Sequence, residues 1–197
     1  HALTLMPQYL SNTGYDQQGL VDLRTAIARR YSERGLPTQA DEVMVVNGAL
    51  SGFALVLRLL TGPGDRVVVD APTYPMAINA IQGASCRPVG VALPEQGWDV
   101  DGLAATIAQT SPRLAFMMPD FHNPTGRCMD SETRQRIAAL AASTRTTLVV
   151  DETMGDLWYS APPPPPLAAF HHEAPIITIG SAGKTFWGGL RIGWIRA

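Results

Sequence analysis

Short apolar runs alternate along this chain with longer stretches that have the spacing of helices. Apolar runs of strand length lie at 43–46, 66–70, 87–93, 114–118, 147–150, 176–179 and 190–195. Helical stretches lie at 50–60, 75–82, 100–109 and 131–142, the last with an N-cap-type start. Strands that alternate with helices predict a mostly parallel sheet covered on both faces, which is a three-layer α/β/α fold.

Five predicted strands are followed by residues that could contact a ligand. In sheets of this kind, ligands bind beyond the carboxyl ends of the strands. The residues at those ends are Gly48, Tyr74, Asn123, Asp151 and Ser181. We therefore expect them to gather at one edge of the sheet.

Each of these residues, taken alone, also has an ordinary structural explanation. Gly48 and Ala49 begin a helix whose free N–H groups attract phosphate, but many such glycines only make a turn. Tyr74 could stack on a planar cofactor or simply pack over the sheet edge. Asn123, in Asn-Pro-Thr-Gly, could bond a ligand oxygen or only form a turn. Asp151 could face a pyridine nitrogen or cap a helix.

The segment 180–193 has the most specific chemistry. Lys184, the chain's one lysine, lies in a loop of small residues after a predicted strand. A lysine amine can form an imine with an aldehyde cofactor. Ser181 and Arg191 on either side can bind a phosphate, the arginine in bidentate fashion.

The composition narrows the class of protein. The chain has 197 residues, 46% of them hydrophobic and 16% charged, and its net charge is −2. It has no basic block for nucleic acid, no apolar run long enough for a membrane helix and no metal-binding cluster. Two cysteines, Cys86 and Cys128, fit a reducing cytoplasm better than a disulfide framework. Five prolines at 162–166 predict a stiff surface loop.

Taken together, these segments resemble the large domain of fold type I enzymes that use pyridoxal 5′-phosphate (PLP), the aspartate aminotransferase superfamily. More closely, the chain resembles the aminotransferase-like domain of GntR/MocR-type transcription regulators. The stretches that carry this resemblance are 14–20 (GYDQQGL), 120–126 (DFHNPTG) and 187–194 (WGGLRIGW). The resemblance covers nearly all of residues 1–197.

The resemblance implies a role for each candidate residue. Lys184 would form the internal aldimine, Asp151 would pair with the pyridine nitrogen, and Asn123 would contact the phenolic oxygen. Tyr74 would stack on the ring, and the phosphate would be held by Gly48, Ala49, Ser181 and Arg191. Tyr15 matches a tyrosine that reaches the phosphate of a neighbouring subunit, which implies a homodimer with shared sites.

Three positions depart from the family pattern. Met154 stands where a tyrosine often touches the phenolic oxygen, and Gly183 where a serine often helps to hold the phosphate. Leu50 stands where the regulators commonly have Gln. Each change removes a polar contact, so we expect PLP to bind less tightly.

By the same resemblance, residues 1–197 form one PLP-binding large domain. The family's smaller C-terminal domain and the regulators' N-terminal DNA-binding domain are expected to lie outside it. The details of 187–194 favour a regulator domain that senses PLP, an amine or an amino acid, and the alternative is a free-standing aminotransferase. A PLP-free α/β binding domain is a third alternative. DNA would be bound only through a separate domain.

Overall fold

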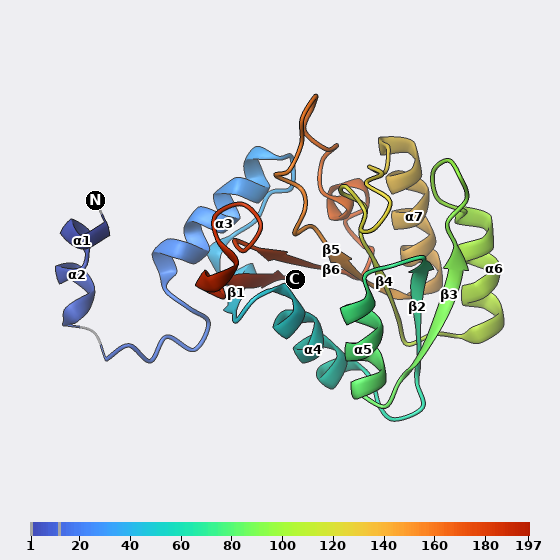
Figure 1. The fold of residues 1–197 in the computed structure, drawn as a ribbon, viewed down its shortest axis with the longest axis horizontal. Coiled ribbons are helices and arrows are strands. Elements are labelled where there is room, and N and C mark those ends of the chain that lie inside the picture. Colours follow the sequence, from blue (N-terminus) through green and yellow to red (C-terminus); the bar gives the residue numbers. More distant parts are fainter. Residues whose placement is uncertain (1, 12) are drawn as a thin grey trace.

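The computed structural model describes residues 2–11 and 13–197, which form a seven-stranded sheet (Figure 1). The strands are β1 (Val43–Val46), β2 (Arg66–Ala71), β3 (Arg87–Ala92), β4 (Leu114–Met117), β5 (Thr147–Asp151), β6 (Ile176–Ser181) and β7 (Gly193–Arg196). Their order is β1-β7-β6-β5-β4-β2-β3. β7 is antiparallel to both of its neighbours, and the remaining pairs are parallel.

Helices cover both faces of this sheet. They are α3 (Val21–Glu33), α4 (Ala49–Leu60), α5 (Pro75–Gly83), α6 (Val100–Thr110) and α7 (Ser131–Thr144), whereas two short helices at the start of the chain, α1 (Ala2–Leu5) and α2 (Pro7–Leu10), lie away from the sheet. Short 3₁₀ turns are η1 (Ala40–Glu42), η2 (Leu167–Phe170) and η3 (Gly188–Leu190).

The alternation of strand side chains divides the core in two. Val68 of β2 packs with the buried residues of α3, α6 and α7, whereas its neighbours Val67 and Val69 pack with those of α4 and α5. Successive strand residues point to opposite faces, so a strand buried on both sides must be apolar throughout. The predicted three-layer α/β/α architecture is confirmed.

The end of the chain differs from the sequence prediction in one respect. A strand was expected over 190–195, but residues 188–190 form η3 and Arg191 adopts a left-handed conformation with φ of 53°. The strand therefore begins only at Gly193, and its antiparallel direction agrees with the family pattern. The turn at Arg191 directs this residue toward the start of α4 instead of into the ladder.

Helix α3 was not predicted from the sequence. Its segment is mostly polar, and only Ile27, Ala28 and Tyr31 are buried. Most of its helical stability must therefore come from packing against the sheet. Among residues 2–11 and 13–197, no helix combines the length and the apolar character needed to cross a bilayer.

Candidate active site

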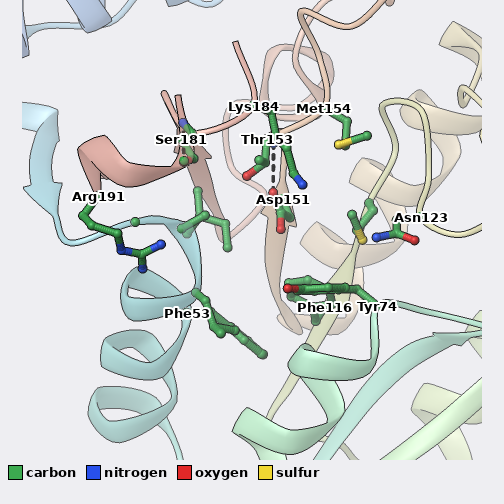
Figure 2. A pocket seen from close by; sticks show the side chains of 17 residues that line it. Phe53, Tyr74, Phe116, Asn123, Asp151, Thr153, Met154, Ser181, Lys184 and Arg191 are labelled. Carbon is green, nitrogen blue, oxygen red and sulfur yellow. Dashed lines mark hydrogen bonds between the residues drawn. The ribbon is translucent and has the colours of Figure 1, made fainter. Parts of the chain in front are cut away.

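A cavity of about 270 Å³ opens at the carboxyl ends of the central strands (Figure 2). A cavity of this volume can hold a small molecule. Eight of the nine candidate residues line it: Gly48, Ala49, Tyr74, Asn123, Asp151, Ser181, Lys184 and Arg191. They come from five strand-end segments that are far apart in the sequence and meet because parallel strands end on the same side.

Tyr15 is the exception. It lies in the segment between α2 and α3, its side chain is 89% exposed, and it does not line the cavity. In Figure 1 this segment and the two short helices before it extend away from the sheet. A contact between Tyr15 and the phosphate of a second subunit stays a prediction.

Gly48, Ala49 and Arg191 form one side of the cavity, which is suited to bind an anion and is called the anion cradle below. Gly48, with φ of 91°, precedes α4, and a Cβ added there would lie 2.9 Å from Nη2 of Arg191. A Cβ on Gly193 would lie 2.6 Å from the Ala49 nitrogen, so the backbone and the guanidinium approach closely only because both residues are glycines. Arg191 also donates to the Asn47 carbonyl at 3.2 Å, which holds it beside the free N–H groups at the start of α4.

Ser181 borders the same cradle, but its hydroxyl is already engaged. Its Oγ donates to the Ile192 carbonyl at 3.2 Å and accepts from the Gly183 N–H at 3.0 Å. To donate to a bound anion, the Ser181 hydroxyl would have to release Ile192.

Lys184 points into the cavity from the loop after β6 (Figure 2). Among the ion pairs of the described residues, none involves its amine. The neighbouring Thr185 donates its hydroxyl to Asp156 at 3.1 Å, and Asp156 also bonds Arg30 of α3. The loop is thus tethered while its amine is left free to react.

Asp151, the last residue of β5, places a buried carboxylate at the floor of the cavity. Its Oδ1 accepts from the Thr153 N–H at 2.9 Å, and no described cationic side chain lies within ion-pair distance. Burial raises the pKa of Asp151, although hydrogen bonds from Thr153 oppose the rise. A buried carboxylate of this kind is stabilised by a cation placed in the cavity.

We predict that Asp151→Asn stabilises the cofactor-free protein at neutral pH. The folded-state pKa is raised, so folding is penalised wherever the unfolded chain would be ionised, which is above the ordinary aspartate pKa of 3.8. The neutral amide removes that penalty and keeps the shape. Urea unfolding at pH 7 and at pH 3 should show the stabilisation at pH 7, and a shrinking difference toward pH 3. A variant that is less stable at pH 7 would show that the Asp151 carboxylate stabilises the empty fold.

The remaining walls are aromatic and apolar. Tyr74 and Asn123 line one side, while the rings of Phe53 and Phe116 pack beneath with centroids 4.6 Å apart. Met154 lines the cavity too, and its thioether offers no hydroxyl where the family often has one. Phe53, Phe116 and Thr153 were not singled out from the sequence, because apolar core residues and a lone threonine carry no functional signal by themselves.

Three buried charged residues and the partly buried Arg34 lie directly behind the Asp151 and Asn123 loops. Arg34 donates to Glu152 at 2.9 Å and to Asp120 at 3.2 Å, and Arg134 donates to Asp120 at 2.6 Å. Burial and the neighbouring Asp120 raise the pKa of Glu152, against the effect of Arg34. Two cations and two carboxylates balance, so this cluster can stay charged inside the protein. It ties the end of α3 to the loops after β4 and β5.

The class I and II aminotransferase family model matches residues 10–197. This chain belongs to that family. The match spans the whole sheet and every residue that lines the cavity, so the family's fold and the resemblance seen in the sequence agree.

The relatives include regulators and enzymes. The uncharacterized HTH-type transcriptional regulator YisV of Bacillus subtilis is 31% identical over 183 residues, which cover 92% of this chain and 38% of that protein. Aromatic-amino-acid aminotransferase 1 of Thermococcus litoralis is 32% identical over 186 residues, covering 91% and 45%. This chain therefore spans less than half of either relative.

The solved structures agree with the fold. The α-aminoadipate aminotransferase LysN of Thermus thermophilus, complexed with N-(5′-phosphopyridoxyl)-L-leucine, superimposes with a TM-score of 0.87 at 25% identity. That alignment covers 100% of this chain and 51% of LysN. The family and a neighbour that holds a pyridoxyl compound together imply PLP chemistry for this fold.

Proposed function

We propose that this domain binds PLP through Lys184, and that the intact protein is a GntR/MocR-type transcription regulator. The observation that carries the first part is the cavity itself. It brings a free amine, a buried carboxylate without a cationic partner and an anion cradle together. An aldehyde, a protonatable ring nitrogen and a phosphate on one planar ring would match these three groups.

The position of each residue in the cavity implies its role in binding PLP. Lys184 supplies the amine for covalent attachment, and Asp151 would hold a proton on the ring nitrogen. Gly48, Ala49 and Arg191 would bind the phosphate, with Ser181 at its margin. Tyr74 would cover one face of the ring, and Asn123 would donate to its phenolic oxygen. When bound, PLP supplies an electron sink for carbanion chemistry.

The regulator function is supported by the relatives. Several of them are HTH-type transcriptional regulators, among them YisV and YdfD of Bacillus subtilis and YdcR of Escherichia coli. In this proposal the domain senses PLP, an amine or an amino acid, and a separate domain binds DNA. The aminotransferase of Thermococcus litoralis keeps a free-standing enzyme as the second candidate.

Two further properties belong to the proposal. The protein would form a homodimer in which Tyr15 of each chain reaches the phosphate site of the other, which its exposed position between α2 and α3 permits. It would work in the cytoplasm, where the free thiols of Cys86 and Cys128 stay reduced.

The intact protein tests these proposals in one series of measurements. We expect it to bind PLP with a visible absorption band, to sediment as a dimer and to bind DNA with an affinity that changes when PLP or an amino acid is added. A protein that binds no DNA and transfers amino groups at about 1 per second or faster would instead be the enzyme. A protein that binds no PLP would contradict the cofactor assignment.

A further inference from the structure

Three buried polar atoms converge behind the wall of the cavity that Tyr74 and Asn123 form. They are Oδ2 of Asp70, Nε1 of Trp98 and Nε2 of His122, and none has a hydrogen-bond partner among the described residues. Asp70 lies in β2, four residues before Tyr74, and His122 immediately precedes Asn123. Trp98 lies just before α6. Buried polar groups without partners are rare, and each needs an explanation.

The geometry brings these atoms to one place. Nε2 of His122 lies 3.7 Å from Oδ2 of Asp70, which is too far for a direct hydrogen bond. The rings of Trp98 and His122 meet edge to face with centroids 6.0 Å apart. Burial raises the pKa of Asp70 to about 7, and the nearby indole N–H of Trp98 opposes this rise. Trp98 therefore faces the same carboxyl group as His122.

A small cavity adjoins two of the three side chains, those of Asp70 and Trp98. It measures about 10 Å³, and the rest of its lining consists of Asp99 and apolar residues of β2, β3, β4, α6 and α7, without His122. This is about the room that one water molecule needs, and such a water also needs two to four polar partners. Asp70 and Trp98 supply two such partners in the lining, and His122 can be the third because its Nε2 lies 3.7 Å from Oδ2 of Asp70.

We propose that one internal water molecule bridges Asp70, Trp98 and His122, and that these three residues position Asn123 and Tyr74 through it. The water accepts from the Trp98 indole and donates to Asp70 Oδ2 and His122 Nε2. Nδ1 of His122 then carries the ring proton and donates to Thr125 Oγ1, 3.0 Å away. This requires a neutral histidine, in keeping with the lowered pKa that burial and Arg127 give His122.

The bridge has a consequence for the cavity. It joins the segment after β2, which carries Tyr74, to the segment after β4, which carries Asn123. It adds a polar link between the two segments beyond the pairing of β2 with β4, and without it both side chains could shift away from a ligand. The effect on PLP rests on the proposed function, whereas the water site itself does not.

The first experiment is a crystal structure of the intact protein without PLP, at a resolution that shows ordered waters. We expect one water within hydrogen-bond distance of Asp70, Trp98 and His122. A direct Asp70–His122 hydrogen bond with no water between the three residues would overturn the proposal. Because no cofactor is needed, this result is independent of whether the domain binds PLP.

The second experiment measures PLP affinity in variants that remove one partner at a time. Trp98→Phe keeps the ring but loses the N–H, and His122→Asn can keep the bond to Thr125 but lacks an atom at the Nε2 position. Each should weaken PLP binding about 2- to 10-fold, the range expected for one lost hydrogen bond. The double variant should bind PLP with the same affinity as the single variant that binds it less tightly, since the same water is lost only once.

The controls separate positioning from general stability. His122→Gln restores an amide near the Nε2 position and should bind PLP like the parent protein. Trp158→Phe changes a half-exposed tryptophan outside the cavity and should leave PLP affinity unchanged. Additive losses in the double variant, or unchanged affinity in both single variants, would overturn the proposal even if the water is present. Unfolding midpoints of the cofactor-free variants identify any that fail to fold. If one of the two single variants fails, the PLP affinity of the other one tests the proposal.

Discussion

Lys184→Arg should lose the visible absorption band of the PLP-bound protein in full. Lys184 is the one lysine of residues 1–197, and it is the side chain in the cavity whose amine can join the aldehyde. Arginine keeps the positive charge and most of the length of the side chain, but its guanidinium does not form an imine with the aldehyde. The change therefore removes the covalent bond while it keeps the electrostatics of the loop.

Absorbance spectra and borohydride reduction followed by peptide mapping check this expectation. The parent protein should carry the reduced label on Lys184, and Lys184→Arg should carry none within residues 1–197. Non-covalent PLP binding should persist in the variant, because the anion cradle and Asp151 are unchanged. A label at the same yield in Lys184→Arg would defeat the assignment of the cofactor lysine.

Arg134→Leu should cost about 3–5 kcal/mol in the free energy of unfolding, the range for breaking a buried ion pair by removing one partner. Arg134 is fully buried in α7 and donates to Asp120 at 2.6 Å, to the Met129 carbonyl at 3.0 Å and to the Pro165 carbonyl at 3.2 Å. Leucine leaves the buried Asp120 carboxylate with Arg34 as its one cationic partner and strips the two carbonyls of a donor. The proline-rich loop after β5 would lose an anchor at the same time.

Arg136 on the same helix provides the matched control. Its ion pair with Asp101 is 2.9 Å long, but both side chains are largely exposed to solvent. Exposed pairs contribute about 0–1 kcal/mol, so Arg136→Leu should change stability by about 1 kcal/mol or less. Urea unfolding of both cofactor-free variants measures the difference. Similar losses in the two variants would mean that the Arg134 network contributes no more than a surface pair.

The sequence by itself determined the architecture and most of the cavity. Apolar runs such as 67–69 and 114–117, set between stretches with helical spacing, predict strands buried on both faces, because every residue in them is apolar. Once the strands are placed, the rule that ligands bind beyond their carboxyl ends brings Asp151 and Lys184 into one site. These residues were predictable because a local pattern, read along the chain, fixes their positions at strand ends.

The tertiary structure decided what depends on contacts between distant segments. Helix α3 is polar enough to escape a pattern search, yet its C-cap residue Arg34 bonds Glu152 over a separation of 118 residues. The start of β7 is delayed to Gly193, because Arg191 turns toward the start of α4. Asp70, Trp98 and His122 converge only after β2 and β4 lie side by side. Burial, pairing of charges and the meeting of loops are properties of the packed chain, and no local pattern encodes them.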